Sequence, residues 1–131
     1  MKKLLALATA LVFASTSFAG EFPDISVDEL EAKIKSGKVT IIDVNGSRAY
    51  AAAHIPGAID FAKDGKKLKS KLPSKKDALV VAYCGGPSCS AYKRAAKAAE
   101  KLGYTNVRHL SAGRSGWLAA GKTTEKTEAA N

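Results

Sequence analysis

The sequence contains few of the residues that mark fibrous, low-complexity or disulfide-rich proteins. Its 131 residues include 11 glycines, 4 prolines and 2 cysteines. These counts exclude a collagen-like or disordered chain, and two cysteines allow at most one disulfide bridge. No apolar run of about 18 residues follows the N-terminal segment, so no membrane-spanning helix is expected in the body of the chain.

The remaining composition is that of one soluble globular domain, with 46% hydrophobic and 25% charged residues. The net charge is +9, and seven lysines lie between Lys63 and Lys76 with Asp64 as the single acid among them. We interpret this lysine-rich segment as a solvated face. It is also a candidate docking surface for an acidic protein partner, or a surface that steers anionic substrates. Nucleic acid is not expected, because no aromatic residues are interleaved with these lysines.

The first 19 residues have the layout of a secretory signal peptide. Lys2 and Lys3 precede an apolar stretch from Leu4 to Phe13, and small residues flank the expected cleavage site at Ala19. The apolar stretch is short for an uncleaved membrane anchor. We therefore expect a bacterial protein exported to the periplasm, without a membrane span after cleavage. That compartment is oxidising, which matters for the two thiols.

The rest of the chain alternates between helix and strand patterns. Ser26 and Glu29 form a capping box before a helix that ends at Gly37. Apolar runs predict strands at residues 39–44, 79–83 and 107–110, and a short extended piece at 58–61. Helices are predicted at residues 47–53 and 91–102, with a helical turn at 117–120. This order predicts an α/β domain over residues 20–121, with a central, mostly parallel sheet flanked by helices on both faces. Residues 122–131 are predicted to form a flexible tail.

Both cysteines lie in one loop, from Cys84 to Ser90, which we call the cysteine loop. It follows the most apolar strand, and ligands of parallel sheets bind at the carboxyl ends of strands. A tight loop before a helix can gather main-chain amides and the positive helix end around an anion. The residues expected to supply these amides are Gly85, Gly86, Ser88, Cys89 and Ser90. A thiol there would have a lowered pKa, so Cys84 is a candidate nucleophile; the alternative is a cysteine that only packs in the core.

Cys89 adds a second thiol to this loop. It could attack a persulfide on Cys84, release sulfide and close a disulfide, or protect Cys84 from over-oxidation. The alternative is an inert loop residue, because closure depends on a Cα separation that sequence does not give. A metal site is not expected, since His54 and His109 are distant from the cysteines and from each other.

Three blocks of sequence resemble the rhodanese (sulfurtransferase) family in its single-domain form. The first runs from Ile42-Asp43-Val44 through Tyr50 to the His54-Ile55-Pro56-Gly57-Ala58-Ile59 turn, the second is Val81-Ala82-Tyr83-Cys84, and the third comprises Gly103, Tyr104, Val107, Leu110, Gly113, Trp117 and Gly121. The resemblance implies a sulfurtransferase without a cofactor. Cys84 would take sulfane sulfur from a small anionic donor such as thiosulfate or polysulfide and pass it to a thiol or protein acceptor. The loop amides would bind the anionic persulfide, while His54 and Trp117 would be architectural.

The chain also departs from the family pattern. Asn45 and Ala49 stand where the family usually has Arg and Glu, which often pair with each other. The cysteine loop is longer by two residues and lacks the frequent arginine near its end. Two other functions therefore stay open: a periplasmic thiol–disulfide protein that uses Cys84 and Cys89, and a non-catalytic binding module. Phosphatase chemistry is not favoured, because Ser90 occupies the position where it requires arginine.

Overall fold

The computed structural model of the protein describes residues 22 to 128, so the predicted signal peptide lies outside the described residues. The helices are α1 (Val27–Lys35), α2 (Ser47–Ala52), α3 (Phe61–Asp64), the 3₁₀ helix η1 (Gly65–Lys67), α4 (Leu68–Lys71), α5 (Tyr92–Lys101) and α6 (Gly113–Ala119). The strands are β1 (Thr40–Asp43), β2 (Ile59–Asp60), β3 (Val80–Tyr83) and β4 (Val107–His109). Within residues 22 to 128, no helix has the length and apolar character needed to cross a membrane.

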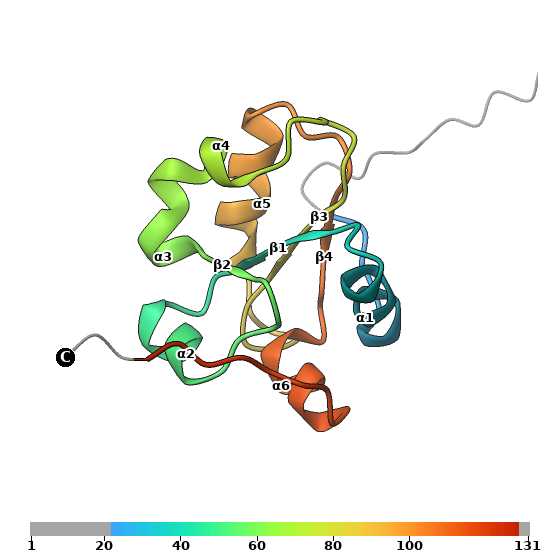
Figure 1. The fold of residues 1–131 in the computed structure, drawn as a ribbon, viewed down its shortest axis with the longest axis vertical. Helices are drawn as coiled ribbons and strands as arrows, with labels where there is room; N and C mark the ends of the chain where they lie inside the picture. The colour runs from blue at the N-terminus through green and yellow to red at the C-terminus, as the bar shows by residue number, and fades with distance from the viewer. Residues whose placement is uncertain (1–21, 129–131) are drawn as a thin grey trace, which may run out of the picture.

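The four strands form one parallel sheet in the order β2-β1-β3-β4 (Figure 1). All three strand pairs are parallel, and β3 lies between β1 and β4. The register places Asp43 beside Tyr83, so β1 and β3 end together at one edge of the sheet. The predicted α/β architecture is confirmed, and its central strand is the one that leads into the cysteine loop.

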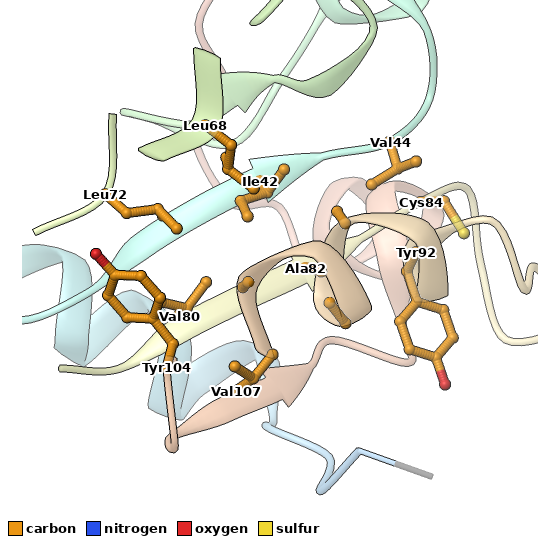
Figure 2. Close-up of a cluster of buried hydrophobic side chains, with 13 residues drawn as sticks. Ile42, Val44, Leu68, Leu72, Val80, Ala82, Cys84, Tyr92, Tyr104 and Val107 are labelled. Atoms are coloured by element: carbon orange, nitrogen blue, oxygen red, sulfur yellow. The ribbon is translucent and has the colours of Figure 1, made fainter. Parts of the chain in front are cut away.

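Alternate residues of the central strands supply two separate apolar clusters. Ile42, Val80 and Ala82 face a cluster completed by alanines of α5 and by Leu68 of α4, drawn in Figure 2. Ile41 and Val81 face the other cluster, which includes side chains of α1 and α6. Side chains on a strand point to opposite faces in turn, so a strand covered on both sides must be apolar throughout. This explains why residues 79–83 show no polar alternation.

The two ends of helix α1 form as its sequence predicts. The Glu29 amide donates to the Ser26 side-chain oxygen at 3.1 Å, which satisfies one of the free amides of the first turn. Gly37 follows the helix with a positive φ of 69° and its amide bonds back to Ile34. Between these ends, Leu30 is fully buried against the sheet.

The lysine-rich segment is folded into the three short helices α3, η1 and α4. Leu68 and Leu72 are its buried residues and anchor it to the cluster beneath α5. Its lysines meanwhile stay largely exposed, since their long side chains reach solvent from the outer surface. The segment therefore contributes an apolar side to the core as well as the solvated face that was predicted.

The described part of the C-terminal segment, for which a flexible tail is predicted, forms hydrogen bonds to the body of the domain. The main chains of His54 and Glu125 exchange two hydrogen bonds, at 3.0 and 2.9 Å. The Trp117 indole donates to the Thr123 carbonyl at 2.9 Å. Figure 1 shows this segment running past α6 to α2. Main-chain pairing is independent of side-chain polarity, so composition does not reveal it.

A leucine pair tests the core on the α1 side of the sheet. We expect Leu30→Ala to lower the free energy of unfolding by about 2–5 kcal/mol, because Leu30 is 0% exposed and its loss leaves a cavity. The same change at Leu118, which is 46% exposed, is expected to cost less than about 0.5 kcal/mol. Urea unfolding of both variants measures the difference. Equal losses would contradict the packing of α1 described above.

Candidate active site

Cys84 follows β3 directly, at the carboxyl edge of the sheet. All four residues of β3 are buried, and the Cys84 side chain is itself 2% exposed. The Val44 amide donates to the Tyr83 carbonyl at 2.9 Å, which continues the β1–β3 pairing one residue past the end of β1. The cysteine therefore lies where the fold class places ligands, on a rigid and fully packed strand end.

The structure joins the sulfurs of Cys84 and Cys89 in a disulfide. Their Cα atoms are 6.2 Å apart, which is within the usual range for a disulfide bridge. Cys89 is half-buried, whereas Cys84 is buried. In this state neither sulfur is a thiolate, and reduction must precede any nucleophilic role of Cys84.

The first turn of α6 supports the cysteine loop. The amides of Arg114 and Ser115 donate to the carbonyls of Cys84 and Gly85, at 2.8 and 2.9 Å. These bonds satisfy amides that a helix start otherwise leaves free. Two loop carbonyls are thereby directed toward α6.

Gly113 permits this close contact. A Cβ atom there would lie 2.5 Å from the Gly86 nitrogen and 2.8 Å from the Cys84 carbonyl oxygen, closer than real Cβ contacts. The residue also has a φ of 63°, which glycine adopts at little cost. The sequence shows Gly113 as part of the third family block, but not this contact.

The loop amides predicted to bind an anion differ in their bonding. The Cys89 amide is used within the loop, donating to the Gly86 carbonyl at 3.1 Å. The other four make no hydrogen bond to any residue between 22 and 128; they belong to Gly85, Gly86, Ser88 and Ser90. Four amides of the cysteine loop are thus without a protein partner in the described part of the chain, which leaves them as hydrogen-bond donors.

A buried hydrogen-bond network lies beneath the site. The Tyr83 hydroxyl donates to the Asp43 carboxylate and accepts the Ile55 amide at 3.0 Å. The backbone amide of Asn45 donates to the other oxygen of the Asp43 carboxylate at 2.8 Å. Burial raises the pKa of Asp43, against the opposing effect of these donors. Burial and the nearby Asp43 also raise the pKa of Tyr83, so the hydroxyl remains a donor. The sequence shows Asp43 as part of the first family block, but not this network.

The two histidines are both buried, and the contacts described below are with residues outside the cysteine loop. His54 Nδ1 lies 2.7 Å from the Tyr50 carbonyl oxygen, and its ring stacks on the Tyr50 ring. Its Nε2 lies 3.5 Å from a Glu125 carboxylate oxygen. His109 stacks on the Tyr92 ring, and burial lowers its pKa. These contacts support the structural roles that the sequence suggests. No cluster of three metal-ligating side chains occurs in the described region.

A family model for the rhodanese-like domain matches residues 26–120. The chain belongs to this family. A curated relative, "HTH-type transcriptional regulator Rv0324" of Mycobacterium tuberculosis, is 33% identical over 117 residues, which are 88% of this chain and 50% of that protein. This rhodanese-like chain thus spans about half the length of that relative.

Solved structures share the same fold. The BH2092 protein from Bacillus halodurans is 28% identical with a TM-score of 0.67, covering 80% of this chain and 77% of that one. A thiosulfate sulfurtransferase from Pseudomonas aeruginosa is 27% identical with a TM-score of 0.65, covering 83% of this chain and 20% of that one. A human single-domain sulfurtransferase, TSTD1, is 24% identical with a TM-score of 0.60, covering 74% of this chain and 96% of that one. These likenesses show that the chain shares the rhodanese-like fold.

Two glycines with positive φ provide a matched test of the α6 contact. Gly121→Ala is expected to cost about 1–2 kcal/mol of stability through backbone strain alone, since no atom lies within 4 Å of the added Cβ. Gly113→Ala has the same strain and also overpacks against the loop backbone, which adds about 1–3 kcal/mol. Denaturant unfolding of both variants measures this difference. If the two variants lose equal stability, the close contact between α6 and the cysteine loop is not real.

Proposed function

We propose that this rhodanese-like protein is a sulfurtransferase in which Cys84 carries sulfane sulfur as a persulfide. The observation that carries the proposal is the position of Cys84, at the end of the buried strand β3 and at the start of a loop with four unbonded amides. A persulfide is an anion, and donors already fixed in place stabilise it without reorganisation. Sulfurtransferases among the structural neighbours support the same chemistry.

The reaction begins with the reduced protein. The Cys84 thiolate attacks the sulfane sulfur of a donor such as thiosulfate; the new S–S bond forms at Cys84 and sulfite leaves with the electron pair of the broken bond. An acceptor thiolate then attacks the outer sulfur of the Cys84 persulfide. The acceptor becomes the persulfide, and the Cys84 thiolate leaves with the electron pair. No external oxidant or reductant enters this cycle once the disulfide is open.

The proposed setting is the periplasm, as the N-terminal signal pattern suggests. The disulfide between Cys84 and Cys89 would be the resting form there, and a thiol reductant would open it before each period of activity. External thiols are expected to attack Cys89, because its side chain is the more exposed of the two. Cys84 is then the leaving thiolate, stabilised by the loop amides.

Persulfide formation is the direct test. The reduced protein, incubated anaerobically with thiosulfate or polysulfide, is expected to gain the mass of one sulfur atom on Cys84, located by peptide mass spectrometry. Cys84→Ser should gain none. Cys89→Ser should retain the adduct for longer, because no second thiol can release sulfide from it. Fully reduced, folded protein that forms no adduct with either donor would overturn the proposal.

A second candidate function, favoured by the disulfide itself, is thiol–disulfide exchange. Two external thiols would reduce the bridge and become a disulfide, with the electrons passing to Cys84 and Cys89. Equilibration in glutathione buffers, followed by thiol trapping, measures the reduction potential. A redox role predicts a value near those of exchange proteins, between about −120 and −270 mV. A value below about −300 mV would make the bridge structural and exclude this function.

A further inference from the structure

The positive charge of the molecule is concentrated in two segments of the chain. Residues 61–77 and α5 (Tyr92–Lys101) hold eleven lysines and arginines and three acids, whereas the remainder of residues 22–128 holds eight cationic and eight acidic residues. The net charge of the described chain therefore comes from these two segments alone. We call their exposed surface the cationic face.

Both segments cover the same side of the sheet. Leu68 and Leu72 pack into one apolar cluster with the alanines of α5. Figure 1 shows α3, α4 and α5 together, away from α1. Lys63, Lys66 and Arg94 line one pocket, so cations of the two segments adjoin each other. The cationic face is therefore one surface rather than two separate patches.

The cations of this face are exposed, and few of them are paired with acids. Ten of the eleven are exposed, and Lys93 is half-buried. Within residues 22–128, Lys71 alone among them forms an ion pair, with Asp64 at 4.0 Å. Elsewhere in the molecule, Arg108 and Lys122 bind carboxylates of α1 at 2.8 to 3.1 Å. The cationic face thus keeps an excess of positive charge, which attracts a surface of negative charge.

The composition of the cationic face differs from that of a protein–protein interface. Ten of its eleven cations are lysines, whereas such interfaces are depleted in lysine and enriched in arginine and aromatic residues. The two aromatic residues of these segments are not exposed, since Phe61 is half-buried and Tyr92 is buried. The face therefore does not offer the aromatic anchors that dominate the affinity of protein complexes. Many hydrated ammonium groups on flexible side chains fit a sheet of lipid phosphates, which requires no defined pocket.

The cationic face also offers no large apolar side chain for insertion into a bilayer. Leu118 is the exposed large hydrophobic residue of the described chain, and it belongs to α6, which packs on the other side of the sheet. Attachment to a lipid surface would therefore depend on charge alone. Such attraction acts within a Debye length, about 8 Å at physiological ionic strength, and is reversible and sensitive to salt.

We propose that the cationic face docks this protein peripherally on a bilayer surface of anionic phospholipid. Lysines of residues 61–77 and of α5 lie against the headgroups, and the side of the sheet covered by α1 faces away from them. The cysteine loop directly precedes α5, so docking holds it near the bilayer surface. The docking is independent of the proposed sulfur chemistry, because it uses none of the residues assigned to that reaction.

Co-sedimentation with lipid vesicles is the direct test. The chain from Gly20 onward, without the predicted signal peptide, is mixed with phosphatidylcholine vesicles that contain about 30% phosphatidylglycerol or none. At about 0.1 M salt, binding to the anionic vesicles is expected to be at least about tenfold tighter, and about 0.5 M salt should release the protein. Equal binding to both vesicles, or binding that persists at high salt, would overturn the proposal. Binding to poly-L-glutamate without binding to the anionic vesicles would assign the face to an acidic protein instead.

Matched charge variants locate the contact. The face variant carries Lys67→Gln, Lys69→Gln and Lys97→Gln, and is expected to bind the anionic vesicles at least about tenfold more weakly. The control variant carries Lys38→Gln, Arg48→Gln and Lys126→Gln, which remove the same charge outside the face, and should change binding less than about twofold. All six side chains are exposed, and none forms an ion pair within residues 22–128, so both variants should keep the stability of the parent. Equal weakening by the two sets would mean that net charge alone controls binding, and the assignment of the face would be wrong.

Lysine acetylation reports the orientation of the bound protein. With anionic vesicles present, Lys67, Lys69 and Lys97 should be acetylated more slowly than in free protein, while Lys38 and Lys126 keep their rates. Peptide mass spectrometry measures each rate, and all five side chains are exposed in the free protein. An equal slowing at all five positions would show that no face is preferred, and would overturn the proposal.

Discussion

Two main-chain hydrogen bonds between the first turn of α6 and the cysteine loop set the geometry on which the site depends. The loop leaves the central strand, and its first two carbonyls are bound by amides of α6. Four amides of the same loop make no hydrogen bond to the residues that the structure describes. A loop with the same sequence but no helix behind it would have no fixed direction for either set of groups. Gly113 makes the arrangement possible, since any side chain there would separate the helix from the loop.

A buried hydrogen-bond network holds the carboxyl ends of β1 and β3 in place. The buried Asp43 carboxylate receives the Tyr83 hydroxyl and the Asn45 amide, and the hydroxyl in turn receives the Ile55 amide. A buried polar group without partners is costly, so the ends of β1 and β3 and the turn after α2 are held in a single relative position. The C-terminal segment adds to this through its pairing with His54. Cys84 thus follows directly on a buried and fully hydrogen-bonded strand end.

The disulfide is a second feature of the cysteine loop in this rhodanese-like domain. The bridge makes the state of Cys84 dependent on the redox conditions, because a bonded sulfur cannot accept sulfane sulfur.

The sequence by itself determined the fold class, the central strand and the position of the two cysteines. These depend on local patterns: the unbroken apolar run before Cys84, the capping box at Ser26, and the motif blocks around His54 and Trp117. Tertiary structure decided the rest, because the decisive contacts join residues far apart in the chain. Glu125 meets His54, Tyr83 meets Asp43, and Gly113 meets Gly86 only after the sheet has brought them together. Likewise, Arg94 joins Lys63 and Lys66 around one pocket because α5 and the lysine-rich segment cover the same face of the sheet, a relation that no local pattern of charge encodes.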